Sequence, residues 1–163
     1  MKVGIVLLCC LFVASCAPPP PDMTQVRKDI EAINVKAEKD MLAGTMDTTM
    51  AQYADDPISM PNNGPLLKGK SAIKEYYSKM MGTGFKFLKV HFMTDNVMAG
   101  GPYFFEVGTY TMTMQMGTMP EMSDEGKYLT VYERGADGKL KIKVETWNTN
   151  KMPPMPGSEK QAM

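Results

Sequence analysis

Apolar positions in the first part of the chain recur with the spacing of a helix. Between residues 22 and 44 they lie three or four positions apart, so they share one face of a predicted helix. Asp22 or Thr24 can cap the start of this helix, and Gly44 is suited to its end. The apolar positions are Val26, Ile30, Ile33, Ala37 and Met41.

Two shorter helices are predicted before the pattern changes. The first spans about Met46 to Tyr53, and Asp55-Asp56-Pro57 closes it because proline disfavours helical geometry in the residue before it. A short strand is expected from Ile58 to Met60. The second of these helices is predicted over residues 71–81, with Ser71 as its cap.

From Phe85 onward, segments rich in Val, Thr, Tyr and Phe alternate with turns of Gly, Pro and Asp, which is typical of strands. Ala136-Asp137-Gly138 predicts a hairpin between the last two strands. Helices followed by a strand meander predict an α+β fold with an antiparallel sheet. The expected strands are Phe85 to Met98, Tyr103 to Met116, Lys127 to Arg134 and Leu140 to Asn150.

The segment that precedes the first helix has the layout of a secretory signal. Lys2 is followed by an apolar run from Val3 to Val13 and then by small residues. The run is about 11 residues long, whereas a helix needs roughly 20 to span a bilayer. Val13-Ala14-Ser15-Cys16 resembles the lipobox of bacterial lipoproteins, in which the cysteine is acylated and the chain is cut before it.

Four parts of the chain are predicted. Residues 1–15 are the expected signal peptide, and residues 16–22 are a tether with lipidated Cys16 and a stiff proline run. The domain is expected over 23–151, followed by a disordered tail over 152–163. The resemblance implies a cell-envelope protein that is bound to the membrane through Cys16. In lipoproteins an Asp directly after the cysteine favours retention in the inner membrane. This chain has Ala17 there, so in a host with two membranes the protein is expected on the outer membrane, facing the periplasm.

Charge and cysteine content narrow the function classes. The 18 basic and 18 acidic residues balance, so the chain has no electrostatic footprint for nucleic acid. All three cysteines lie at or before Cys16, which leaves the domain without a disulfide, a thiolate metal site or a cysteine nucleophile. We therefore expect no cofactor.

Seven motifs then occur in a recognisable order: Gly44, Tyr53-Ala54-Asp55-Asp56, Asn63 to Ile73, Gly108-Thr109-Tyr110, Gly126-Lys127-Tyr128, Asp137 to Ile142, and Trp147-Asn148. Together they resemble the SnoaL-like and ketosteroid-isomerase-like domains of the nuclear-transport-factor-2-like superfamily. The resemblance covers about residues 25 to 150. It implies a cystatin-like α+β roll, in which a curved antiparallel sheet wraps around N-terminal helices into a cone with an apolar pocket, often as a homodimer.

The resemblance does not extend to isomerase chemistry. Ketosteroid isomerases combine a carboxylate base with a tyrosine and a protonated aspartate. Carried over residue by residue, these three positions become Pro61, Ala37 and Thr130, none of which can perform the role. We therefore expect the pocket to bind a small apolar ligand without isomerase catalysis.

Candidate pocket residues follow from the strand pattern. Glu145 and Trp147 share one face of the last strand, as alternate residues do. An alternative hypothesis is an enzyme of isomerase, lyase or hydrolase type that uses Glu145, His91 and tyrosines such as Tyr110 or Tyr128. The predicted pocket residues are Tyr110, Met112, Met114, Tyr128, Thr130, Glu145, Trp147 and Asn148.

Methionine makes up 18 of the 163 residues. Thioethers suit Cu(I), and close spacing lets several sulfurs converge on one ion, so a periplasmic Cu(I) site is a further alternative. Methionine is equally a flexible filler of cores and pocket walls. The residues that would form this metal site are Met112, Met114, Met116, Met119 and Met122.

Overall fold

The computed structural model describes residues 20–151. The predicted signal peptide, Cys16 and the predicted tail lie outside the described residues. No helix of the described part is long and apolar enough to cross a bilayer. The elements are α1 (Met23–Ala43), α2 (Met46–Met50), β1 (Tyr53–Met60), β2 (Leu67–Lys68), α3 (Lys70–Gly82), β3 (Phe85–Gly100), β4 (Tyr103–Met116), β5 (Met122–Arg134) and β6 (Leu140–Thr149).

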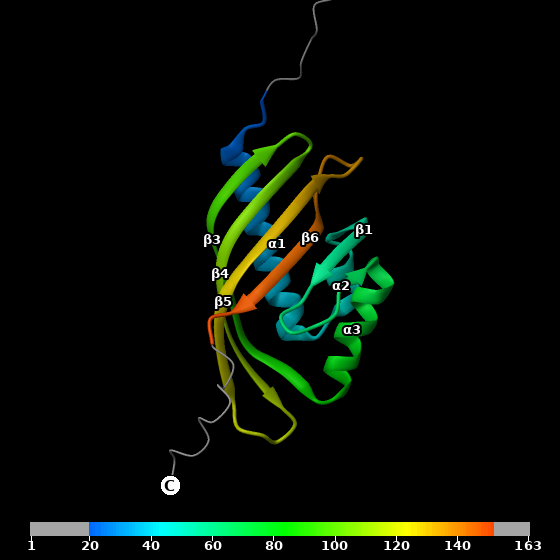
Figure 1. Ribbon diagram of the computed structural model, residues 1–163, viewed down its shortest axis with the longest axis vertical. Coiled ribbons are helices and arrows are strands. Elements are labelled where there is room, and N and C mark those ends of the chain that lie inside the picture. The colour runs from blue at the N-terminus through cyan, green and yellow to red at the C-terminus, as the bar shows by residue number, and fades with distance from the viewer. Residues whose placement is uncertain (1–19, 152–163) are drawn as a thin grey trace, which may run out of the picture.

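The strands form one curved six-stranded sheet in the order β2-β1-β6-β5-β4-β3. Neighbouring strands run antiparallel, except that β1 is parallel to β6. Helix α1 lies across one face of the long strands, and α2 and α3 lie beside β1 (Figure 1). This is the α+β architecture that the order of elements predicts, with one parallel pair added.

Helix α1 confirms the pattern of its apolar positions. Val26 and Ile30 are buried against the sheet. Asp22 caps the helix by accepting hydrogen bonds from the backbone N–H groups of Thr24 and Gln25. Gly44 ends it with a φ of 67°, a left-handed conformation that glycine adopts without strain.

The segment after α2 departs from its prediction. The helix ends at Met50, and Tyr53 and Asp55-Asp56-Pro57 belong to strand β1 instead of closing a helix. Pairing with β6 determines this outcome, and the register is irregular between Tyr53 and Ile58, where proline can be accommodated without a ladder hydrogen bond. Asp56 forms an ion pair with Lys143 of β6, whose hydrogen bond and charge lower the pKa of Asp56.

Two further boundaries differ from the sequence prediction. Helix α3 begins at Lys70 behind Gly69, which has a φ of 82° and provides no side-chain cap, so Ser71 lies within the first turn. Strand β5 begins at Met122, because its ladder with β4 continues back to the pair Met114 and Met122. The hairpin at Ala136-Asp137-Gly138 is confirmed.

The hydrophobic core lies where α1 and α3 meet the sheet. Ile30 and Ile73 have no exposed surface, and they belong to one cluster with side chains from β1, β4, β5 and β6. Tyr132, only 1% exposed, is among the largest of these buried side chains. The core therefore joins the helical half of the chain to the strand meander.

Two Gly-x-Tyr motifs pair across the centre of the sheet. Gly108 of β4 lies opposite Tyr128 of β5, and Tyr110 of β4 lies opposite Gly126 of β5. Each tyrosine ring lies over the glycine of the other strand, because a Cβ on either glycine would come within 2.5 Å of that ring. The two missing side chains therefore make the space that the two tyrosines occupy.

We expect Gly108→Ala and Gly126→Ala each to destabilise the fold by about 2 kcal/mol or more, as overpacking does. The new Cβ would also lie 2.5 Å from the Met93 carbonyl oxygen or 2.2 Å from that of Asn148, and backbone cannot easily move. Gly82→Ala, where the Cβ meets nothing within 4 Å, is the control. Urea denaturation measures the effect, and equal stability of all three variants would contradict this packing.

Candidate functional site

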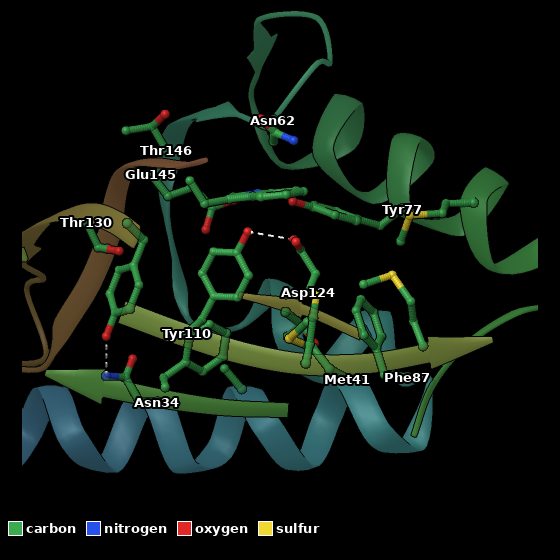
Figure 2. Close-up of a pocket in the computed structure, with 18 of the residues that line it drawn as sticks. Asn34, Met41, Asn62, Tyr77, Phe87, Tyr110, Asp124, Thr130, Glu145 and Thr146 are labelled. Atoms are coloured by element: carbon green, nitrogen blue, oxygen red, sulfur yellow. Dashed lines mark hydrogen bonds between the residues drawn. The ribbon is translucent and has the colours of Figure 1, made fainter. Parts of the chain in front are cut away.

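A cavity of about 510 Å³ lies between the inner face of the sheet and helices α1 and α3. Its volume is within the range typical of small-molecule sites. Figure 2 shows Asn34 and Met41 of α1 on one side of this space and Tyr77 of α3 with Glu145 of β6 on the other. The cavity is lined mostly by aromatic and methionine side chains, with a few polar groups among them.

One end of the cavity is rich in methionine and phenylalanine, and we call this part of its lining the methionine wall; Asp124 lies at the same end, opposite Met112. The wall is formed where the start of β3 meets the adjoining ends of β4 and β5, together with α1 and α3. Methionine is unbranched and polarizable, so such a wall adapts to apolar ligands of different shape. The methionine wall consists of Met41, Met80, Met81, Phe85, Phe87, Met112, Met114 and Met122.

The other end of the cavity holds the carboxylate of Glu145. Its Oε1 accepts hydrogen bonds from the hydroxyl of Tyr53, at 2.8 Å, and from that of Ser59, at 2.7 Å. Its Oε2 has no protein partner within residues 20–151, yet it is not a sealed buried atom, so it faces the cavity. Burial raises the pKa of Glu145, and the hydrogen bonds from Ser59 and Tyr53 only partly oppose this shift.

Aromatic groups surround this carboxylate. Burial and the charge of Glu145 raise the pKa of the Tyr77 hydroxyl, while hydrogen bonding to Trp147 and Ser59 lowers it. Tyr77 thus lies close to both residues. Trp147 follows Glu145 by two positions on the inner face of β6, and its ring packs edge-to-face on Tyr110, with the ring centroids 6.1 Å apart.

A second carboxylate lines the cavity, but its oxygens are already occupied. Oδ2 of Asp124 accepts a hydrogen bond from the Tyr110 hydroxyl at 3.0 Å (Figure 2), and Oδ1 accepts one from Thr149 at 2.6 Å. Lys151 lies 4.0 Å from the same Oδ1. Burial, together with the hydrogen bond and charge of Asp124, raises the pKa of Tyr110. Asp124 therefore differs from Glu145 in having a cation beside it and a donor on each of its two oxygens.

A third carboxylate, Glu106, lies beneath the lining and is fully buried. Its Oε1 accepts hydrogen bonds from Asn34, Thr94 and Tyr128 at 2.7, 2.6 and 2.7 Å. Its Oε2 accepts one from Tyr132 at 2.7 Å. These donors come from α1, β3 and β5, so Glu106 ties the helix to the sheet and is not free to meet a ligand.

Solved structures share the fold of this chain. A ketosteroid isomerase-like protein from Erwinia carotovora atroseptica matches with a TM-score of 0.68 and 17% identity, over 77% of this chain and 96% of that chain. A nuclear-transport-factor-2-like protein with a cystatin-like fold from Novosphingobium aromaticivorans matches with a TM-score of 0.64 and 11% identity, over 80% of this chain and 86% of that chain. The fold is nuclear-transport-factor-2-like.

A third protein of this nuclear-transport-factor-2-like fold comes from Catenulispora acidiphila and is described in complex with S-DNPA. It matches with a TM-score of 0.68 and 10% identity, over 77% of this chain and 94% of that chain. No protein-family model matches the sequence, and no curated protein matches it. At these sequence identities the similarity establishes the fold alone. Any inference about activity has to come from the residues that line the cavity.

The nuclear-transport-factor-2-like cavity brings together most of the residues predicted for it. Asn148 is the exception: it is exposed and does not line the cavity. Its prediction was wrong because neighbouring residues of a strand point to opposite faces, so Trp147 and Asn148 cannot both face inward. The predicted residues that do line the cavity are Tyr110, Met112, Met114, Tyr128, Thr130, Glu145 and Trp147.

The positions that correspond to isomerase residues carry no acid. Ala37 and Thr130 line the cavity, whereas Pro61 does not and its neighbour Asn62 does. His91 is exposed outside the cavity, with its Nδ1 3.2 Å from Oε1 of Glu38. The alternative catalytic set of Glu145, His91 and a tyrosine therefore does not converge.

The methionines proposed as a Cu(I) site are divided between two environments. Met112, Met114 and Met122 line the cavity, although Met122 is also 41% exposed, while Met116 and Met119 are exposed and do not line it. The described geometry thus favours the role of cavity wall for the inward-facing methionines.

Sequence reasoning missed four of the polar groups in and around the cavity. Tyr53 and Ser59 lie on β1, part of which was predicted as helix, and Tyr77 lies on α3, where no cavity residue was predicted. Asp124 lies before the predicted start of its strand. Extending the alternation of Tyr128 back by two and four positions reaches Gly126 and then Asp124, so this residue could have been found.

We expect the unfolding free energy of the protein to depend on pH through Glu145. Its folded pKa is raised above the ordinary value of 4.5, so folding favours the protonated acid. The resulting stability is fully present below pH 4.5 and is lost as pH rises through the folded pKa. Glu145→Gln mimics the neutral form, so its stability relative to the wild type should increase over that interval.

Urea denaturation between about pH 4 and pH 8 measures this difference. Glu125→Gln removes an exposed carboxylate on the neighbouring strand and is the matched control, with no pH-dependent gain expected. A constant difference between Glu145→Gln and the wild type across the range would contradict the environment described for Glu145.

Proposed function

We propose that this chain is a lipid-anchored envelope protein whose cavity binds a small, mostly apolar molecule with one polar group. The observation that carries the binding function is the open cavity of about 510 Å³, lined mainly by aromatic and methionine side chains and containing one carboxylate oxygen without a protein partner. A few directed polar groups in an apolar cavity are typical of sites that orient a ligand.

The distribution of polarity in the cavity supports an elongated ligand. The methionine wall lies at one end, and Glu145 with Tyr53 and Ser59 lies at the other. Burial of an apolar group releases about 25 cal/mol per Å², so contact with the methionine wall would provide most of the affinity. The polar end would then determine the orientation. The Catenulispora acidiphila protein, described in complex with S-DNPA, supports occupation of this fold by another molecule.

Ligand binding is favoured over catalysis by the chemistry of the lining. The isomerase positions hold Ala37, Thr130 and Pro61, and His91 lies outside the cavity. Glu145 is the one carboxylate of the described cavity with a free oxygen, because both oxygens of Asp124 accept protein hydrogen bonds. A single acid of this kind is sufficient to orient a bound molecule.

The anchoring part of the proposal rests on the sequence before the fold. The apolar run Val3 to Val13 followed by Ala14-Ser15-Cys16 supports cleavage before Cys16 and its acylation. More than one acyl chain gives stable attachment to a membrane. The described fold begins at Asp22 and Met23, so the proline run would separate it from the lipid surface.

We expect Ala37→Phe to reduce binding of an apolar fluorescent probe, N-phenyl-1-naphthylamine, by about tenfold or more, because the ring would fill part of the cavity. A soluble chain that starts at residue 17 allows fluorescence titration without lipid. Val35→Phe adds the same ring to an exposed position of α1 and is the matched control. Equal probe affinity in both variants, or no binding by the wild type, would contradict the proposed cavity site.

We expect Cys16→Ser to abolish metabolic labelling with radioactive palmitate in a bacterial host and to release the protein from the membrane fraction. The thiol of Cys16 is the proposed site of acylation, and serine cannot form the thioether. Cys10→Ser, within the apolar run, should be labelled like the wild type. Undiminished labelling of Cys16→Ser would refute the anchor.

A further inference from the structure

Of the two carboxylates that line the described cavity, only one has a basic side chain beside it. Lys151 is the one basic side chain of the described lining, and it lies beside Asp124. Glu145 has no basic side chain within ion-pairing distance among residues 20–151, although it is half-buried between β1, β6 and α3. The polar end of the cavity therefore has an acid without a cation.

One oxygen of Glu145 is available to accept a hydrogen bond from a ligand. Tyr53 and Ser59 both donate to Oε1, which fixes the orientation of the carboxyl group and directs Oε2 toward the cavity. A buried carboxylate is costly unless it is paired with a positive group. Burial raises the pKa of Glu145 and so favours its protonated form. A ligand that brings a positive charge would stabilise the ionised form.

Three aromatic residues neighbour Glu145 and offer further interactions to a cation at the same place. The Tyr53 hydroxyl donates a hydrogen bond to Glu145, and the charge of Glu145 raises the pKa of Tyr77. Trp147 lies two positions after Glu145 on the inner face of β6. The faces of such rings attract ammonium groups, most strongly where water is excluded. An anionic ligand would instead meet Glu145 and Asp124 with no uncommitted basic side chain in the described lining.

We propose that the cavity selects a lipophilic amine, whose ammonium group donates a hydrogen bond to Oε2 of Glu145 while its apolar chain lies along the methionine wall. This inference rests on the proposed binding function and specifies the class of ligand. It uses the carboxylate, the neighbouring rings and the apolar wall together.

Three ligands of equal chain length test the selection. Decylamine, 1-decanol and decanoate compete at pH 7 against N-phenyl-1-naphthylamine, which is neutral at that pH, for the soluble wild-type chain. We expect decylamine to displace the probe at a concentration about tenfold or more below that of 1-decanol, with decanoate weakest, because a charge-assisted hydrogen bond is stronger than a neutral one.

Glu145→Gln should remove the preference for decylamine, so that decylamine and 1-decanol displace the probe from this variant at concentrations within about twofold of each other. Glu125→Gln, which removes an exposed negative charge, is the matched control and should keep the preference. Circular dichroism and probe affinity confirm that the variants are folded with an intact cavity.

Each outcome has a distinct meaning. Equal displacement by decylamine and 1-decanol in the wild type would overturn the amine selection and leave the apolar site standing. A preference that persists in Glu145→Gln but disappears in Asp124→Asn would also overturn it, because the ammonium group would then bind at the other carboxylate. Failure of the probe and of all three competitors to bind would refute the proposed function itself.

Discussion

The buried carboxylate of Glu106 is the constraint on which the cavity depends. Four donors from α1, β3 and β5 converge on it, and a fully buried charge without them would strongly destabilise the fold. Because three of the donors, Asn34, Tyr128 and Tyr132, also line the cavity, the same hydrogen bonds hold these side chains in place. Glu106 therefore fixes the distance between helix and sheet, and with it the width of the space available to a ligand. Glu145, by contrast, keeps one oxygen free.

Local patterns predicted most of the fold because most of its elements bury a single face. Helix α1 and the long strands have apolar positions at the helical or strand period, and Gly44 and Gly138 mark ends that need a left-handed backbone. Strand β1 was predicted incorrectly in its first half, where Asp55-Asp56-Pro57 has little strand propensity. Pairing with β6, which lies far away in sequence, overrides that local preference.

The candidate site was predictable to the extent that it follows strand alternation. Starting from Trp147, alternation leads to Glu145, and the register of β4 and β5 brings Tyr110 and Tyr128 to the same face. The hydroxyls of Tyr53 and Ser59 were not predictable in this way, since they reach Glu145 only through the parallel pairing of β1 with β6. No periodic pattern encodes a contact between two elements that are distant in sequence. For the same reason, the free oxygen of Glu145 is a property of the tertiary structure.

The parallel pairing of β1 and β6 also has a consequence for the order of folding. Tyr53 and Glu145 are 92 positions apart, and β1 has no other long strand beside it in the described sheet. A nascent chain that ends before β6 therefore lacks the strand that connects its helical half to its meander, and closing so long a loop is slow. Until β6 is available, the edges of β1 and β5 that pair with it have no hydrogen-bonding partner. The sheet therefore becomes continuous only after β6 has been synthesised.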